Sequence, residues 1–153
     1  VVFELYTGKP FMEKAVPADK LGVLLWADYG FNAYAHSYIA NTDFLKNNPE
    51  AARKFLKVVY RAWDFTLKNI PESIEILSKY HPINKDDFVA NLTAVREFFK
   101  TDRYRNNGIG YIDAARMQDT INLVKEKGVE IKGPAGDFYT VEFLPNPPFK
   151  FNY

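Results

Sequence analysis

The first forty residues alternate short apolar runs with polar breaks. Residues 1–6, VVFELY, are β-prone, and the TGKP of residues 7–10 supplies a turn, because glycine accepts positive φ and proline cannot donate to a ladder. Residues 21–26 predict a second, buried strand. The Asp-Tyr-Gly at 28–30 breaks it, and residues 34–40 predict a third strand.

The hydrophobic period changes after this third stretch. Asn48 can cap a helix, Pro49 fits its first position, and Glu50 suits the positive end of the helix dipole. Apolar or small side chains then recur at helical spacing. They are Ala51, Phe55, Val58, Ala62, Thr66 and Ile70. The pattern predicts an amphipathic helix with one face in a core.

Further helices are predicted in the second half of the chain. One covers residues 72–80, and a second begins after a capping Asn84. Residues 101–110 are polar and predict a loop. Asp113 can cap a last helix, predicted over 114–127. The tail from residue 133 is rich in glycine, proline and aromatic residues, which indicates an irregular segment that must dock on something.

Short strands followed by a helical block predict an α/β fold. A chain of 153 residues can bury the core of one domain but is tight for two. Aromatic residues make up 16%, which indicates a well-filled core or a pocket for flat molecules. The longest apolar run, residues 21–27, is too short to span a bilayer.

Charge and cysteine content exclude several classes of function. The formal net charge is +1, with basic and acidic side chains interspersed, so no nucleic-acid footprint is expected. There is no cysteine, which excludes disulfides, thiolate metal sites and a cysteine nucleophile.

Motifs for catalysis are also missing. The two histidines, His36 and His81, are isolated in sequence, and no nucleophile elbow, phosphate loop or zinc motif occurs. We therefore predict no enzyme activity, no catalytic residue, no metal and no cofactor.

Polar and aromatic side chains gather where the predicted strands end. In open α/β sheets, ligands bind at strand ends, where loops converge over a crevice. Tyrosine and asparagine supply flat contact surface and adaptable hydrogen bonds, although tyrosines here could also fill a sheet–helix boundary. The predicted ligand-binding residues are Thr7, Lys9, Tyr29, Asn32, Tyr34 and His36.

Several stretches together resemble a known family. ADYGFNAYAHSYIANTDFLKNNPE (27–50), GIGYIDAARMQ (108–118) and DFYTVEFLP (137–145) are similar, in that order, to the NMT1/THI5-like substrate-binding proteins, relatives of the SsuA- and TauA-type sulfonate and taurine binders and of the nitrate binders. The resemblance implies a fragment of a periplasmic-binding-protein type II fold, lacking its first lobe and signal sequence. Residues 1–36 would end the middle lobe and form a hinge-side strand, and residues 37–153 would form the C-terminal helical part.

The resemblance implies an extracytoplasmic solute-binding protein, periplasmic or lipid-anchored, that delivers its solute to the permease of an ABC importer. The solute would be a small heteroaromatic, sulfonate or carboxylate-like molecule, bound by hinge closure. Lys9 stands where pyrimidine-precursor binders often carry a carboxylate, and a lysine only donates hydrogen bonds, so a cleft-facing Lys9 favours an anionic or carbonyl-bearing solute. Lys9 could equally be a solvated loop residue.

Two other functions stay open on the sequence. The chain could be a ligand-sensing domain of a signalling protein, or a fragment of a THI5-like pyrimidine-synthesis protein. A fragment would also expose apolar surface, and self-association through residues 1–6 is therefore predicted.

Overall fold

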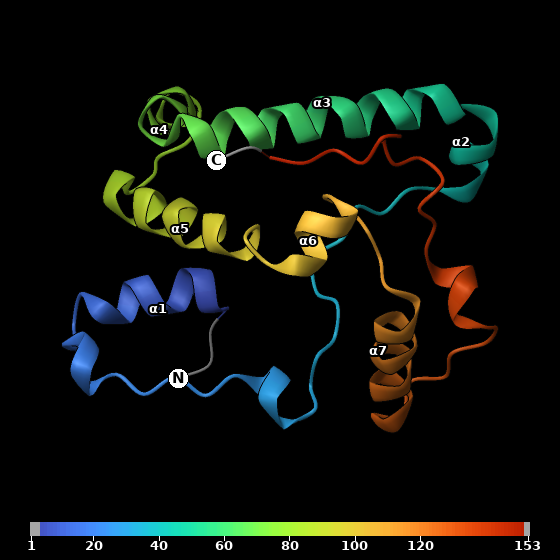
Figure 1. The fold of residues 1–153 in the computed structure, drawn as a ribbon, viewed down its shortest axis with the longest axis horizontal. Helices are drawn as coiled ribbons and strands as arrows, with labels where there is room; N and C mark the ends of the chain where they lie inside the picture. The colour runs from blue at the N-terminus through green and yellow to red at the C-terminus, as the bar shows by residue number, and fades with distance from the viewer. Residues whose placement is uncertain (1–3, 152–153) are drawn as a thin grey trace. The chain divides into compact units, whose positions relative to one another are not determined.

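A computed structural model describes residues 4–151, and all regular secondary structure in them is helical (Figure 1). The helices, in chain order, are α1 (Leu5–Glu13), α2 (Thr42–Asn47), α3 (Pro49–Lys68), α4 (Ile70–Ser78), α5 (Lys85–Phe98), α6 (Asp102–Asn107) and α7 (Ala114–Glu126). Three short 3-10 turns are η1 (Ala18–Lys20), η2 (Trp26–Tyr29) and η3 (Ala135–Phe138).

The α/β prediction is wrong, because residues 4–151 contain no strand and no sheet. Residues 21–25 and 31–40, which include most of the second and third predicted strands, have no regular secondary structure. Neither stretch lies beside a second strand, so no ladder forms. The predicted fragment of a periplasmic-binding-protein type II fold, with short strands before a helical block, is therefore replaced by helices joined by extended segments. The part of the first predicted strand at residues 1–3 lies outside the described residues.

The stretch predicted as a strand and turn forms α1 instead. Pro10 lies inside this helix and cannot donate to the carbonyl of Tyr6 one turn earlier. In the amide orientation that satisfies both of its groups, the Asn91 nitrogen donates to that carbonyl at 3.1 Å. Tyr6 also packs edge-to-face on Phe98, with ring centroids 6.1 Å apart. Packing on α5 thus outweighs the β propensity of the segment (Figure 1).

Predicted caps mark helix starts correctly in the later half. The Asn84 side chain accepts from the Asp87 amide at 3.2 Å at the start of α5, and Asp113 accepts from the Arg116 amide at 2.9 Å at the start of α7. Pro49 is the first residue of α3, as its sequence context indicates. The predicted loop at 101–110 holds the short helix α6, which begins after the Thr101 cap.

The described chain divides into two compact units. The first comprises residues 4–22, 57–109 and 147–151, and the second comprises residues 23–56 and 110–146. The long helix α3 supplies its first two turns to the second unit and the remainder to the first.

The core of the first unit is built around Leu67, whose side chain is fully buried, and the aromatic rings of Tyr104 and Phe151. Phe99 packs edge-on against both rings, at centroid distances of 5.0 and 4.8 Å. The Tyr104 hydroxyl accepts a hydrogen bond from the Phe151 amide, which ties the C-terminal segment to α6.

Gly108 makes this docking of the C-terminal segment possible. Its φ of +77° lies in the left-handed region, and a Cβ there would meet the Phe149 carbonyl oxygen at 2.7 Å. The next amide, of Ile109, donates to that carbonyl at 3.0 Å. Only glycine allows the two backbone segments to approach this closely.

We expect Leu67→Ala to lower the free energy of unfolding by about 3 kcal/mol, because it leaves a cavity in the core of the first unit. Leu24→Ala is the matched control, since that leucine is 64% exposed and should change the free energy by about 0.5 kcal/mol or less. Urea unfolding followed by circular dichroism measures both. Equal losses in the two variants would contradict this core.

The Tyr6 hydroxyl should lose its proton at a higher pH than an ordinary tyrosine. Its burial, then its hydrogen bond to Glu4 and the charge of Glu4, raise the pKa of Tyr6 from 10.0 to about 12. The folded state therefore favours the neutral phenol, and the resulting stabilisation is complete below pH 10 and is lost as the pH rises through about 12. The tyrosinate absorbance difference between wild type and Tyr6→Phe measures this pKa. Glu4→Gln should lower it, and a Tyr6 pKa near 10 in the wild type would refute the assignment.

Candidate functional site

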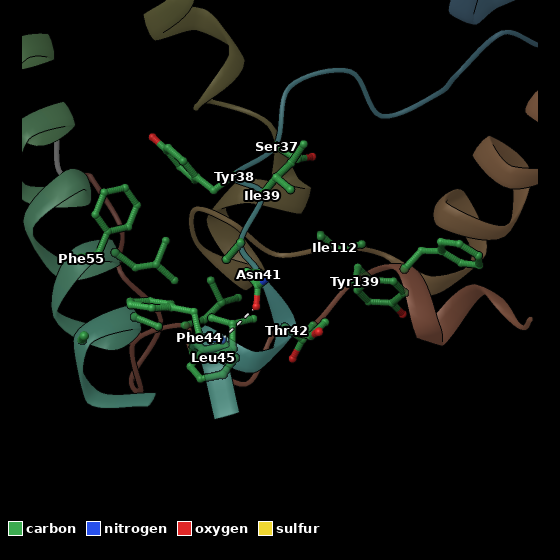
Figure 2. Close-up of a pocket in the computed structure, with 18 of the residues that line it drawn as sticks. Ser37, Tyr38, Ile39, Asn41, Thr42, Phe44, Leu45, Phe55, Ile112 and Tyr139 are labelled. Atoms are coloured by element: carbon green, nitrogen blue, oxygen red, sulfur yellow. Dashed lines mark hydrogen bonds between the residues drawn. The ribbon is translucent and has the colours of Figure 1, made fainter. Parts of the chain in front are cut away.

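The second unit contains a pocket of about 840 Å³ (Figure 2). Four segments of that unit line it: residues 37–45, the first turns of α3 from Ala51 to Leu56, the pair Ile112 and Met117, and residues 137–144. Figure 2 shows the rings of Phe44, Phe55 and Tyr139 among the labelled side chains around it. The volume falls in the range of about 300–1,000 Å³ that is typical of small-molecule sites.

Local capping builds the first wall. The Asn41 side chain accepts hydrogen bonds from the amides of Asp43 and Phe44, at 2.8 and 3.1 Å, and so begins α2. Asn41 and Phe44 are labelled in Figure 2. The Asn48 amide then donates to the Phe44 carbonyl at 2.8 Å, and Pro49 opens α3 directly afterwards. This tight succession of two helices brings Phe44 and Phe55 to the same pocket.

The opposite wall, residues 137–144, begins at the end of η3, continues without regular secondary structure and is held by α3. Arg53 donates to the Glu142 carbonyl oxygen at 2.5 Å, and its guanidinium lies 5.3 Å from the centre of the Phe143 ring. The Thr140 hydroxyl accepts from the Glu142 amide at 3.1 Å. One arginine thus fixes the segment that carries Tyr139 and Phe143.

The lining is mostly apolar and aromatic, with a few polar groups. Tyr38 and Phe55 contact edge-to-face, with ring centroids 5.7 Å apart. Hydroxyl and amide groups come from Ser37, Tyr38, Asn41, Thr42, Tyr139 and Thr140. Asp137 is the one Asp, Glu, Lys or Arg among the described lining residues. Such a lining can stack on a flat ring and exchange hydrogen bonds with its edge.

Within residues 4–151, no group of three or more histidine, aspartate or glutamate side chains is placed to hold a metal ion. The same residues include no helix of the length and apolar character needed to cross a membrane.

Two of the six predicted site residues lie in the first unit, on α1. The Thr7 hydroxyl donates to the Glu4 carbonyl at 3.2 Å. The Lys9 ammonium forms an ion pair with Glu13, one turn later on the same helix. Neither residue is among those that line the pocket.

The other four lie in the second unit, immediately before the pocket-lining segment. Tyr29 ends η2 and is 74% exposed, and His36 is exposed one residue before Ser37. Asn32 and Tyr34 both contact α7: the Asn32 carbonyl accepts from Arg116 at 3.0 Å, and the Tyr34 hydroxyl accepts from the Asp113 amide at 2.9 Å. None of these four residues lines the pocket, and their predicted contact with a ligand stays a prediction.

Sequence reasoning missed the pocket-lining residues on α2, α3 and η3. One signal was present, because the aromatic tail at 133–145 indicates a segment that must dock. The sequence pattern does not show which residue elsewhere in the chain contacts that tail. The partner is Arg53 on α3, 89 residues before Glu142.

Comparison with known proteins gives a match to a family model. Residues 2–73 match the family model described as NMT1/THI5 like, which confirms the resemblance noted in the sequence over that stretch. The family covers substrate-binding proteins of ABC transporters and THI5 proteins. The comparison with curated proteins found no match, and neither did the comparison with solved structures.

Proposed function

We propose that this chain, which is NMT1/THI5-like over residues 2–73, belongs to the solute-binding component of an ABC importer and takes a small heteroaromatic solute into the pocket of its second unit. One observation carries the proposal. The aromatic pocket of about 840 Å³ is lined in part by residues 37–56, which lie inside the family match. The solute is bound and released unchanged.

The charge of the lining supports a heteroaromatic solute over a sulfonate or a carboxylate. A buried anion needs a cation or a set of converging donors, and the described lining contains neither lysine nor arginine. Arg53 is nearby in sequence, but its guanidinium is engaged with Glu142 and Phe143. A neutral ring with amide or amine groups at its edge can use the hydroxyl and amide groups of the pocket.

The proposal implies an extracytoplasmic location and a permease as the macromolecular partner. These follow from the role of the ABC substrate-binding proteins in the matching family. The chain would meet the membrane through its transporter.

Filling the pocket should weaken solute binding. Ala51 lines the pocket at an exposed position of α3, so Ala51→Trp should block the space without disturbing a core. Ala62→Trp is the matched control, because Ala62 is exposed on the same helix and does not line the pocket. We expect wild type and Ala62→Trp to bind riboflavin or cytosine, and Ala51→Trp to bind at least about tenfold more weakly, in isothermal titration calorimetry.

The same titration is run with taurine, nitrate and benzoate. Binding of these anions with no binding of riboflavin or cytosine would contradict the heteroaromatic assignment. Equal affinity of Ala51→Trp and wild type would place the solute outside this pocket. No binding of any compound would refute the solute-binding function.

A further inference from the structure

The segment just before the pocket has no regular secondary structure, and side chains of α7 hold it in place. Arg116 donates to the carbonyl oxygens of Asn32 and Ala33, at 3.0 and 3.2 Å. The Tyr34 amide donates to the Thr120 hydroxyl at 3.0 Å. These bonds replace the strand pairing that the sequence pattern predicts for this stretch.

Tyr34 is the centre of this arrangement. The Arg116 guanidinium carbon lies 4.3 Å from the centre of the Tyr34 ring, a cation–π distance, and the hydroxyl at the far end of the ring accepts from the Asp113 amide at 2.9 Å. Asp113 also caps α7 through the Arg116 amide. We call the contacts of residues 32–34 with Asp113, Arg116 and Thr120 the clasp.

Both segments that the clasp joins continue directly into pocket-lining residues. Three residues after Tyr34, Ser37 begins the wall formed by residues 37–45, and three residues span at most about 10 Å. On α7, Met117 follows Arg116 directly and lines the pocket. Ile112, just before the capping Asp113, also lines it. The clasp therefore joins the chain leading into one wall to the helix that carries part of another.

We propose that Tyr34 and Arg116 are positioning residues for the pocket, which fix the wall at residues 37–45 against α7 before a solute arrives. This inference rests on the proposed function. The two residues act through the wall, because neither lines the pocket. A wall that is ordered in advance spares the solute the conformational entropy of ordering it, and this raises affinity.

The wall geometry can be measured without a ligand by spin labelling. The chain has no cysteine, so a label attaches only to cysteines that are introduced. Nitroxide labels are placed at Asp43→Cys on α2 and Asp119→Cys on α7, two exposed positions in the second unit that do not line the pocket. Pulsed electron spin resonance gives the distance distribution between them. We expect a narrow distribution that broadens with Tyr34→Phe or Arg116→Gln and stays narrow with the control Tyr80→Phe, because Tyr80 is 76% exposed in the first unit.

Binding is measured in parallel on unlabelled protein with riboflavin and cytosine. Tyr34→Phe and Arg116→Gln should weaken binding about tenfold, and Tyr80→Phe should leave it unchanged. Saturating probe should narrow the broadened distance distribution of Tyr34→Phe back to the wild-type width, since ligand and clasp favour the same wall geometry. A residue that only stabilised the fold would not give this recovery.

An unchanged distance distribution in both clasp variants overturns the inference, and so does a broadened distribution with unchanged affinity; in the second case the solute-binding function still stands. If wild type binds no probe, the proposed function fails and the role in binding fails with it. The distance distribution then still decides whether the clasp fixes the wall.

Discussion

Side chains on helices hold two irregular segments of this chain by hydrogen bonds to their backbone. A backbone N–H or C=O without a partner is costly once water is excluded, and a sheet would normally supply those partners. Within residues 4–151 there is no sheet. Side chains on helices take over: Arg116 on α7 reaches the carbonyl of Asn32, and Arg53 on α3 reaches that of Glu142.

This constraint shapes the pocket in the second unit. Two of the segments associated with it, residues 32–41 and 139–144, have no regular secondary structure. An arginine contacts each of them and combines carbonyl hydrogen bonding with contact to an aromatic ring. The planar guanidinium can serve both purposes at once, which a lysine ammonium cannot. The arginines are engaged in supporting the walls, and the lining itself stays free of cationic groups. That division favours an uncharged ring as the solute.

The first unit meets the same constraint in its C-terminal segment. The Phe149 carbonyl accepts from the Ile109 amide, next to a glycine that no other residue could replace without a clash. The aromatic rings of Tyr104 and Phe151 then close over Leu67. Burial of the Tyr104 hydroxyl raises its pKa, while the Phe151 amide that it accepts from opposes that rise.

The helices after residue 48 could be predicted because their signals are local. Asn84 and Asp113 cap the helices expected of them, and Pro49 starts α3. The strands could not be judged locally, since an extended run becomes a strand only when a second one lies beside it. α1 was missed for a related reason, because a distant asparagine, Asn91, supplies the donor that Pro10 lacks.

The candidate site was predicted only in part, and for a similar reason. Tyr34 and Asn32 were selected as polar groups at a strand end, and they do lie next to the pocket in sequence, yet their contacts are with α7, about 80 residues later in the chain. The pocket itself combines residues 37–56 with residues 137–144. No sequence pattern pairs these two stretches, and the hydrogen bond from Arg53 to the Glu142 carbonyl joins residues that lie 89 positions apart.

The two methionines of the chain allow the most direct test of the pocket. Met117 lines it, whereas Met12 lies on α1 in the first unit. Nuclear magnetic resonance of protein labelled with ¹³C at the methionine methyl groups therefore reports one signal from each unit. Titration with riboflavin should shift the Met117 methyl resonance, by ring current from the bound heteroaromatic, and leave that of Met12 in place. A shift of Met12 alone, or of neither methyl group at saturating riboflavin, would contradict a heteroaromatic site in this pocket.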